Sequence, residues 1–313
     1  MSQTNTNTLF AGLDIAKSSL QLHLDGQFHR LSNNAKGHQR LLKYLRVHPA
    51  VHIICEATGG YEQAVVQLLQ AAAVPVSLIE AGRIRHFAKA KGLRAKTDPI
   101  DAAVLTQYGL AMRPAPTPPR SAQQQRLAQL SLRRRQLIDL KVMEQNRAEH
   151  YSDPFSRKQS QQLLRLLEKQ MARCDQELAE LVSQDQQLQA KTNRLDEIPG
   201  VGPATAVMVL AQMPELGQLS SQAAAALAGL APYNQDSGAQ AGIRHIYGGR
   251  KAVRCALYMA ALSAVRHDRI LKAFYLRLRL AGKKPIVALT ACMRKLIVLM
   301  NHLLKNPNFQ LAN

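Results

Sequence analysis

The stretch Val51-His-Ile-Ile-Cys-Glu56 decides the fold of the first third of this chain. Val51–Cys55 is a short, continuous, mostly apolar run, typical of strands buried on both faces of a parallel sheet. Leu9–Ile15 and Val74–Ile79 are two further apolar strands, and helical patterns separate the successive runs. Strands that alternate with helices indicate an α/β domain.

The elements around these strands follow from periodicity and turn residues. Leu20–Leu24 alternates with period two, and Asp25-Gly26 is a turn dipeptide that joins it to Phe28–Leu31 as a hairpin. Apolar spacing predicts helices over Lys36–Val47, Tyr61–Ala73 and Ile100–Met112. We therefore expect residues 1–112 to form a three-strand meander followed by strand–helix–strand units.

A Pro-rich segment, Arg113-Pro-Ala-Pro-Thr-Pro-Pro, predicts a stiff, extended linker over residues 113–121, beyond which strand signals stop. Long helices follow over residues 122–193, the first of them Gln123–His150. After the Asp-Pro break at 153–154, apolar residues form a heptad seam, with Asp185 out of pattern: Leu164, Leu167, Met171, Cys174, Leu178, Leu181 and Leu188. A helical hairpin within the chain and an intermolecular coiled coil fit this seam equally well.

Residues 194–313 are predicted to form an all-α domain, interrupted by a polar, Gly-rich stretch from Asn234 to Gly249. Ile198-Pro-Gly200-Val-Gly202 resembles a helix-hairpin-helix turn, whose glycines leave backbone N–H groups free for a phosphate. A plain tight turn between helices explains the same residues.

The charge of the chain narrows the class of partner. Its 313 residues carry 41 Lys+Arg against 21 Asp+Glu, a formal charge of +20. Such an excess attracts polyanions. With no Trp and only 4% aromatic residues, contacts to a phosphate backbone are favoured over stacking on bases.

The N-terminus, the apolar stretches and the cysteines indicate in which cellular compartment the protein works. The N-terminus is unlike a secretory signal, and the apolar stretch near Pro285–Met300 is interrupted by Arg294 and Lys295, so we expect no membrane span and a cytoplasmic, nucleoid-associated protein. Four scattered cysteines without a C-x-x-C pair predict buried, reduced thiols: Cys55, Cys174, Cys255 and Cys292.

Four acids stand out in this basic chain: Asp14, Glu56, Asp98 and Asp101. Asp14 falls at the end of the strand Leu9–Ile15 and Glu56 comes just after the strand Val51–Cys55, and open α/β sheets place ligands at the carboxyl ends of their strands. Asp98 and Asp101 are three residues apart, so they face the same way on a helix. Together they could hold one or two Mg²⁺ ions. Alone, Asp98-Pro-Ile-Asp101 is also a good helix start, and Asp14 a plausible turn residue.

Three motifs carry a family resemblance: Gly-Leu-Asp14-Ile-Ala-Lys, Cys-Glu56-Ala-Thr-Gly-Gly-Tyr and Lys-Thr-Asp98-Pro-Ile-Asp101-Ala. They resemble the motifs of the Piv-like DEDD transposases, insertion-sequence recombinases and DNA invertases. The resemblance implies a RuvC-like ribonuclease H fold for the first domain and Mg²⁺ ligation at Asp14, Glu56, Asp98 and Asp101. It also implies a C-terminal transposase domain in which Ser237 forms a transient phosphoserine link to DNA.

The resulting hypothesis is a site-specific recombinase or transposase that binds donor and target double-stranded DNA. The resemblance further implies a non-coding guide (bridge) RNA, and synapsis of two duplexes suggests a homo-oligomer, a dimer of dimers. The alternatives are a RuvC-like junction nuclease without a covalent intermediate and a non-catalytic nucleic-acid scaffold. The predicted nucleic-acid contacts are Arg94, Lys96, Arg133, Arg134, Arg135, Gly200, Gly202, Arg244, Arg250, Lys251 and Arg254.

Overall fold

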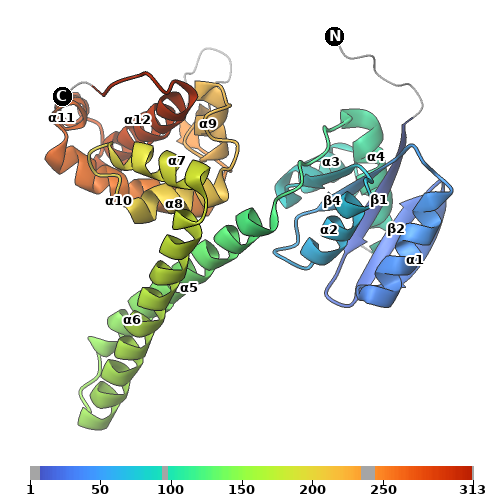
Figure 1. Cartoon of the computed structure of the whole chain (residues 1–313), viewed down its shortest axis with the longest axis horizontal. Coiled ribbons are helices and arrows are strands. Elements are labelled where there is room, and N and C mark those ends of the chain that lie inside the picture. Colours follow the sequence, from blue (N-terminus) through green and yellow to red (C-terminus); the bar gives the residue numbers. More distant parts are fainter. Residues whose placement is uncertain (1–7, 94–97, 234–243, 312–313) are drawn as a thin grey trace. The chain divides into compact units, whose positions relative to one another are not determined.

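The chain forms two compact units, Met1–Pro119 and Arg120–Asn313 (Figure 1). This computed structural model describes residues 8–93, 98–233 and 244–311. The boundary between the units falls inside the Pro-rich segment 113–121.

The first unit is built on a five-stranded sheet with the order β3-β2-β1-β4-β5. The predicted strands are confirmed as β1 (Leu9–Ile15), β2 (Ser19–Leu24), β3 (Gln27–Ser32), β4 (Val51–Glu56) and β5 (Val76–Ile79). The β1–β2 and β2–β3 pairs are antiparallel, whereas β1–β4 and β4–β5 are parallel. The sheet is thus a meander extended by parallel strands, as the sequence predicts.

Helices cover both faces of this sheet. The helices α1 (Ala35–Arg46) and α2 (Gln63–Ala71) pack on one face, where Leu41 and Val65 share a core with Leu13 of β1. The helices α3 (Ala81–Ala90) and α4 (Asp98–Met112) pack on the other, where Ile84 and Leu105 share a core with Ile54 of β4. Helix α3 was not predicted, because its few apolar residues lie among cations.

The Pro-rich segment is extended, and it is bonded to the sheet edge. Thr117 N donates to Val76 O over 2.7 Å, and Leu78 N donates to Thr117 Oγ1 over 2.9 Å. Ser77 Oγ donates to Ala115 O over 2.8 Å. These bonds occupy the backbone groups that an edge strand otherwise leaves open. We therefore treat residues 113–119 as a strap on β5.

The second unit begins with α5 (Ala122–Ala148) and α6 (Pro154–Ser183), which pack against each other as a hairpin (Figure 1). Of the two arrangements predicted for the seam, the hairpin within one chain is the one formed here. All seven apolar seam positions are buried or half-buried. The seam does not lie on one helix, because Asp185 caps α7 (Gln186–Asp196) by accepting from Leu188 N over 3.0 Å.

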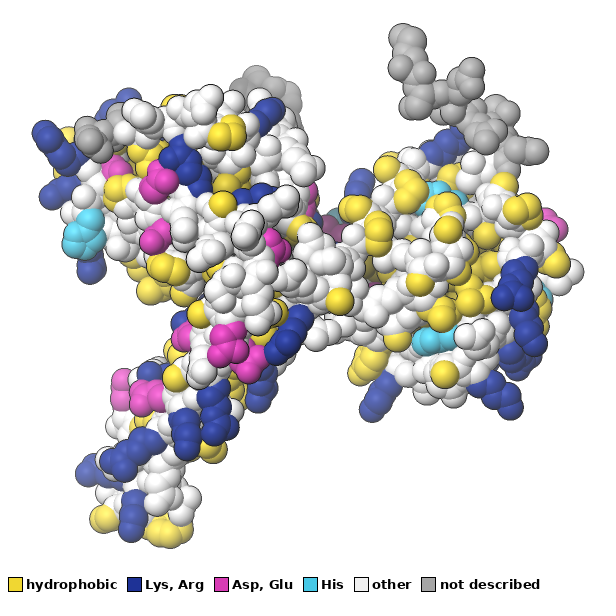
Figure 2. Space-filling model, viewed as in Figure 1, with side chains coloured by type: hydrophobic (Ala, Val, Ile, Leu, Met, Phe, Trp, Pro, Cys, Tyr) yellow, Lys and Arg dark blue, Asp and Glu magenta, His cyan; other side chains and the backbone are white. Residues whose placement is uncertain are grey.

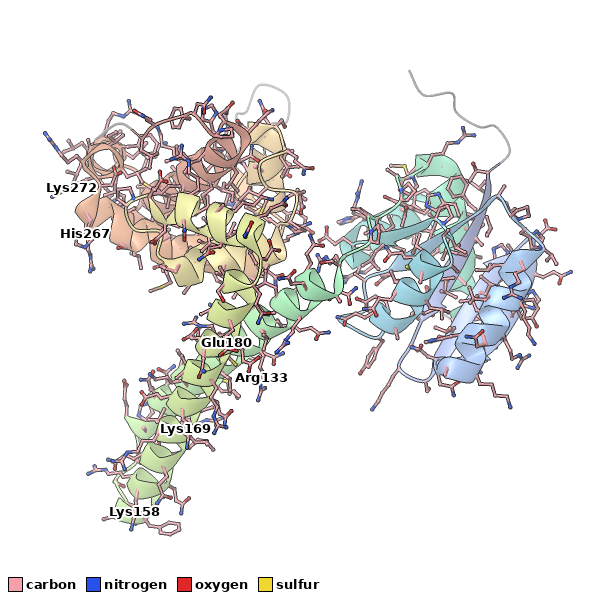
Figure 3. The ribbon with its side chains drawn as sticks, viewed as in Figure 1. Arg133, Lys158, Lys169, Glu180, His267 and Lys272 are labelled. Carbon is pink, nitrogen blue, oxygen red and sulfur yellow. The ribbon has the colours of Figure 1, made fainter. Side chains whose placement is uncertain are left out.

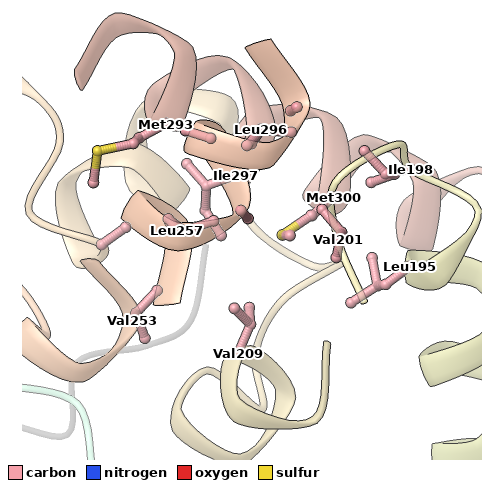
Figure 4. Packing of buried hydrophobic residues seen from close by; sticks show 14 of the residues in the cluster. Leu195, Ile198, Val201, Val209, Val253, Leu257, Met293, Leu296, Ile297 and Met300 are labelled. Carbon is pink, nitrogen blue, oxygen red and sulfur yellow. The ribbon is translucent and has the colours of Figure 1, made fainter. Parts of the chain in front are cut away.

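The remaining helices surround one apolar core (Figure 4), to which Leu195, Val209, Leu257 and Ile297 contribute. They are α8 (Pro203–Gln212), α9 (Ser221–Leu227), α10 (Lys251–His267), α11 (Arg269–Leu280) and α12 (Pro285–Lys305). The prediction of an all-α domain was wrong in one respect. Two short strands, β6 (Pro232–Tyr233) and β7 (His245–Ile246), pair antiparallel, since strands of two residues are too short for a periodic signal.

Helix α12 is longer than the interrupted apolar run suggested. It has 21 residues, and among the described helices it alone is long and apolar enough to cross a membrane by length and composition. Half of the most apolar 18-residue stretch of this helix is buried inside the protein. Leu289, Leu296 and Met300 lie in the core of the unit, which explains the apolar composition.

Candidate metal and DNA site

Asp14 and Glu56 lie at the carboxyl ends of neighbouring parallel strands. The register of β1 and β4 runs to Leu13 opposite Cys55, so Asp14 and Glu56 are the next residues on each strand. Leu13 and Cys55 point into the core beneath α1 and α2. Because side chains alternate along a strand, Asp14 and Glu56 point to the opposite face, where α4 packs.

Helix α4 brings the other two acids to this edge, since Asp98 and Asp101 lie in its first turn. The helix approaches β1 very closely at Gly12. A Cβ on Gly12 would lie 2.0 Å from Ala102 O and 2.7 Å from Thr106 N, so only glycine fits. This contact fixes the height of the first turn of α4 above the strand end.

Thr106 adds a polar clamp at the same place. Its Oγ1 accepts a hydrogen bond from Gly12 N over 2.8 Å and lies 2.8 Å from His23 Nδ1. One hydroxyl therefore joins α4, β1 and β2. Sequence reasoning did not find Thr106 or His23, because residues 83 positions apart show no local signal.

The other three acids lie close enough to Asp14 to affect its pKa. Burial, followed by the charges of Asp101, Asp98 and Glu56, raises the pKa of Asp14 from 3.8 to about 6. Within the described residues no three His, Cys, Asp or Glu side chains form a ready-made metal-binding group. The arrangement is thus a concentration of carboxylates at one edge.

The donor set fits a hard divalent cation. It contains carboxylate oxygens only, the ligand type that Mg²⁺ takes. A cation there would offset the repulsion that raises the pKa of Asp14. Asp98 is the first residue of α4, so its use as a helix start and its place beside Asp14 are compatible.

The loop after Glu56 is held by Glu62, a further residue that the sequence reasoning missed. Glu62 Oε2 accepts from Thr58 Oγ1 over 2.7 Å and from Gly60 N over 2.8 Å. Burial would raise the pKa of Glu62, but these hydrogen bonds outweigh it and lower the pKa below its ordinary value. An acid just after a Gly-Gly loop was the available signal.

Ser237 lies outside the described residues, as do Arg94 and Lys96. The strands β6 and β7 bracket the segment that contains Ser237, with Tyr233 paired to His245. Of the cations predicted around it, Arg244 and Lys251 are exposed.

The other two predicted cations of this region are engaged within the fold. Arg250 donates to Gln212 O over 2.6 Å and pairs with Glu215 Oε1 at 2.6 Å. Arg254 donates to Gly248 O over 2.8 Å. The Arg250 contacts hold the start of α10 against the end of α8, and the Arg254 contact ties Gly248 to α10.

The two glycines of the predicted helix-hairpin-helix turn have different surroundings. Gly200 has φ +88, and a Cβ there would lie 2.5 Å from Ala264 N of α10. Close packing therefore explains Gly200. Gly202 is the N-cap of α8, is exposed, and has open space around it. Only Gly202 leaves room for a phosphate at the start of α8.

The three consecutive arginines of the hairpin also differ. Arg134 pairs with Asp175 of α6, and Arg135 pairs with Asp139 at 2.9 Å. Arg133 is exposed on the hairpin (labelled in Figure 3) and makes no ion pair within the described residues. Figure 2 shows cations and acids interspersed along this hairpin. Arg133 is therefore the member of the three best placed to meet an external phosphate.

Comparison with known proteins identifies the family. A family model described as "Transposase" matches residues 11–151, which include β1, β4 and α4. A second, "Transposase IS116/IS110/IS902 family", matches residues 192–276. The chain belongs to the IS110 family of transposases. The first model covers all four acids, and the second covers the segment that contains Ser237.

Two curated relatives span nearly the whole chain. Both are pilin gene-inverting proteins, from Moraxella bovis and from Moraxella lacunata. Each is 28% identical over 303 residues, which cover 93% of this chain and 94% of the relative. The similarity to the IS110 family and to these relatives thus extends over both units.

Proposed function

We propose that this protein is a site-specific DNA recombinase of an insertion element that joins donor and target DNA by metal-assisted strand cleavage and exchange. The observation that carries the proposal is the meeting of Asp14, Glu56, Asp98 and Asp101 at one sheet edge. The acids come from three separate sequence motifs. If they served only as helix caps and turn residues, they would have no reason to lie at the same edge of the sheet. The pilin gene-inverting relatives favour recombination over simple hydrolysis.

We assign the first unit to the ribonuclease H-like, RuvC-like class. The strand order β3-β2-β1-β4-β5 supports this assignment, with an antiparallel meander on one side and parallel strands on the other. The second support is the position of the acids at the carboxyl ends of β1 and β4.

Mg²⁺, as one or two ions, would supply charge neutralisation and activation of the scissile phosphate. Asp14, Glu56, Asp98 and Asp101 would hold it. Gly12 and Thr106 keep α4 close to β1, and Glu62 keeps the loop after Glu56 in place. These three residues act by positioning the acids.

Ser237 is the proposed nucleophile. Its Oγ forms a bond to the scissile phosphorus while a P–O bond of the DNA backbone breaks, and the serine proton ends on the leaving DNA hydroxyl. A hydroxyl of the partner strand then attacks the phosphoserine and restores the serine. Exposed Arg244 and Lys251 border the segment that contains Ser237, and cations there would stabilise the charge on the phosphate.

We further propose a guide RNA, a homo-oligomer and a cytoplasmic, nucleoid-associated location. High positive charge and few aromatic residues suit contacts to nucleic-acid backbones. Exposed apolar side chains on the hairpin, such as Leu132 at 50% and Leu166 at 52%, support contacts between protomers. RNA that co-purifies with protein from cells carrying the native flanking DNA tests the guide RNA.

The nucleophile is tested by trapping. A nicked suicide DNA substrate should leave a phosphoserine adduct on the wild-type protein, and mass spectrometry should place it at Ser237. Ser237→Ala should form no adduct and no recombinants. If Ser237→Ala still cuts DNA at the wild-type rate, the protein is a metal-dependent nuclease instead.

The metal site and its assembly are tested by two further variants. Glu56→Ala should bind DNA but not recombine it, which separates the enzyme from a non-catalytic scaffold. Mixing Asp14→Ala with Ser237→Ala protein should restore recombination if the two halves of the site come from different protomers. A mixture without activity would exclude assembly in trans.

A further inference from the structure

The segment between β5 and α4 is strongly basic. Residues 81–97 contain no Asp or Glu, and their Lys and Arg residues are Arg83, Arg85, Lys89, Lys91, Arg94 and Lys96. Helix α3 makes up residues 81–90 of this segment. The nearest acid before it is Glu80, the N-cap residue of α3.

The fold places α3 on the same face of the sheet as the acidic site. Ile79, two residues before α3, pairs in register with Glu56, and Ala57 N donates to Ile79 O over 2.9 Å. The other end of the segment runs into Asp98. Ile84 of α3 packs on the same sheet face as α4. Helix α3 thus follows β5, the strand that pairs with Glu56, and precedes α4, which carries Asp98 and Asp101.

Three cations of α3 are available to a ligand. Arg83, Arg85 and Lys89 are exposed, and within the described residues none of them forms an ion pair. Arg85 Nε donates to Ala81 O of the same helix over 3.3 Å, which leaves its charge unpaired. Ile84 and Phe87 direct the other side of the helix into the core. Lys91, by contrast, donates to Gln107 Oε1 over 2.8 Å.

A cationic surface near the four acids would offset their repulsion of a DNA strand. Four carboxylates repel an incoming phosphodiester, and one or two bound cations offset that repulsion only at their own position. Neighbouring phosphates of the same strand need further positive charge. At about 1.5 Å per residue α3 is about 15 Å long, and a duplex rises by about 3.4 Å along its axis for each phosphate of one strand, so the helix matches the axial rise of roughly four phosphates.

We propose that α3 binds the sugar–phosphate backbone of the DNA strand whose phosphate enters the acidic site. The inference rests on the proposed function in one point, that the substrate is DNA. Phe87, the single Phe, Tyr or Trp of α3, is half-buried, and the exposed side of the helix is dominated by cations, so we expect contacts to the backbone rather than to bases.

Helix α1 offers a matched control. Lys36, Arg40 and Lys43 are exposed at helical spacing on a helix without acids. This helix covers the opposite face of the sheet, away from Asp14. Figure 2 shows Lys and Arg side chains gathered over α1. Removing three charges from α1 changes the net charge as much as removing three from α3.

The experiment measures equilibrium binding of fluorescent duplex DNA by the full chain carrying Asp14→Asn, at several salt concentrations. One variant adds Arg83→Gln, Arg85→Gln and Lys89→Gln, and the control adds Lys36→Gln, Arg40→Gln and Lys43→Gln. We expect the α3 variant to bind at least tenfold more weakly and its salt slope to fall by about 2 to 3, at about 0.9 for each phosphate contact. The α1 control should lose less than threefold.

Equal losses in both variants, or wild-type binding by the α3 variant, would overturn the proposal. Weaker binding of duplex RNA, with binding of duplex DNA unchanged, would also overturn it. A version with Arg83→Lys and Arg85→Lys should retain binding, which separates loss of charge from loss of fold. Because every arm carries Asp14→Asn, the result does not depend on whether the protein recombines DNA.

Discussion

At the scale of single residues, Asp14 links the fold to the chemistry. Its raised pKa means that the folded protein favours the neutral carboxyl. The stability that this contributes is fully present below pH about 3.8, and it is lost as the pH rises through about 6. The metal-free protein therefore carries an unfavourable charge at neutral pH.

Asp14→Asn should stabilise the metal-free protein at pH 7.5 by about 1 kcal/mol. At about 1.4 kcal/mol per pKa unit, the shift of Asp14 from 3.8 to about 6 corresponds to about 3 kcal/mol, and the smaller figure allows for solvent screening of the partly exposed carboxyl. The gain should vanish near pH 3.5, below the ordinary pKa of 3.8, where the carboxyl is neutral in both the folded and the unfolded protein. Thermal unfolding at the two pH values measures it, with Glu80→Gln as an exposed control. A lower Tm for Asp14→Asn at pH 7.5 would contradict the expectation.

The same experiment tests cation binding. Mg²⁺ should raise the Tm of the wild-type protein, because a ligand that binds only the folded state stabilises it. This shift should disappear in Asp14→Asn, which keeps the size of the side chain and removes the charge.

Thr106→Val should weaken the clamp between α4 and β1. The variant keeps the shape of the side chain but leaves Gly12 N without its partner, at a cost of about 1–3 kcal/mol. Urea unfolding measures the loss, and recombination should fall with it because Asp98 and Asp101 move with α4. Thr106→Ser should retain both properties. If Thr106→Val unfolds in urea with the wild-type free energy, the hydroxyl of Thr106 does not stabilise the contact between α4 and β1.

At the scale of elements, the turn between α7 and α8 separates packing from binding. Gly200→Ala should destabilise the protein by about 2 kcal/mol or more, because φ is positive there and the new Cβ meets the backbone of Ala264. Gly202→Ala should change stability little, since its φ is −81 and its surroundings are open. Thermal unfolding of both variants checks this.

DNA binding then decides the role of the turn. A phosphate at the start of α8 predicts weaker binding by Gly202→Ala at unchanged stability. Unchanged DNA binding by this variant would mean that the turn serves only as a joint between helices.

The hairpin shows what periodicity can and cannot predict. The heptad seam predicted its buried face correctly, because side-chain spacing on a helix is a local property. The seam did not show whether that face packs against a helix of the same chain or of another chain. It also did not show that Arg134 is paired with Asp175, which lies 41 residues away, whereas Arg133 makes no ion pair among the described residues.

At the scale of the whole molecule, the strap on β5 predicts where the first unit ends. A fragment of residues 1–119 should fold alone, because it contains its own core and the bonds of Thr117. A fragment of residues 1–112 should be less stable by about 1–3 kcal/mol, since Val76 O and Leu78 N lose their partners.

Urea unfolding of the two fragments makes this comparison. Thr117→Val in the longer fragment serves as a control, because it removes the side-chain bond to Leu78 N and keeps the backbone bond to Val76 O. It should fall between the two fragments. Equal stability of both fragments would show that the strap contributes nothing to the unit.

The sequence by itself determined the strands, the Pro-rich boundary and the three acidic motifs, because apolar alternation, proline and short spacing are local properties. Only the tertiary structure decided that Asp14 and Glu56 face α4, that Gly12 and Thr106 hold this helix against β1, and that a basic α3 lies beside the acids. These facts depend on which face of the sheet each helix covers. That choice is made by burial of side chains far apart in the chain, and no local pattern records it.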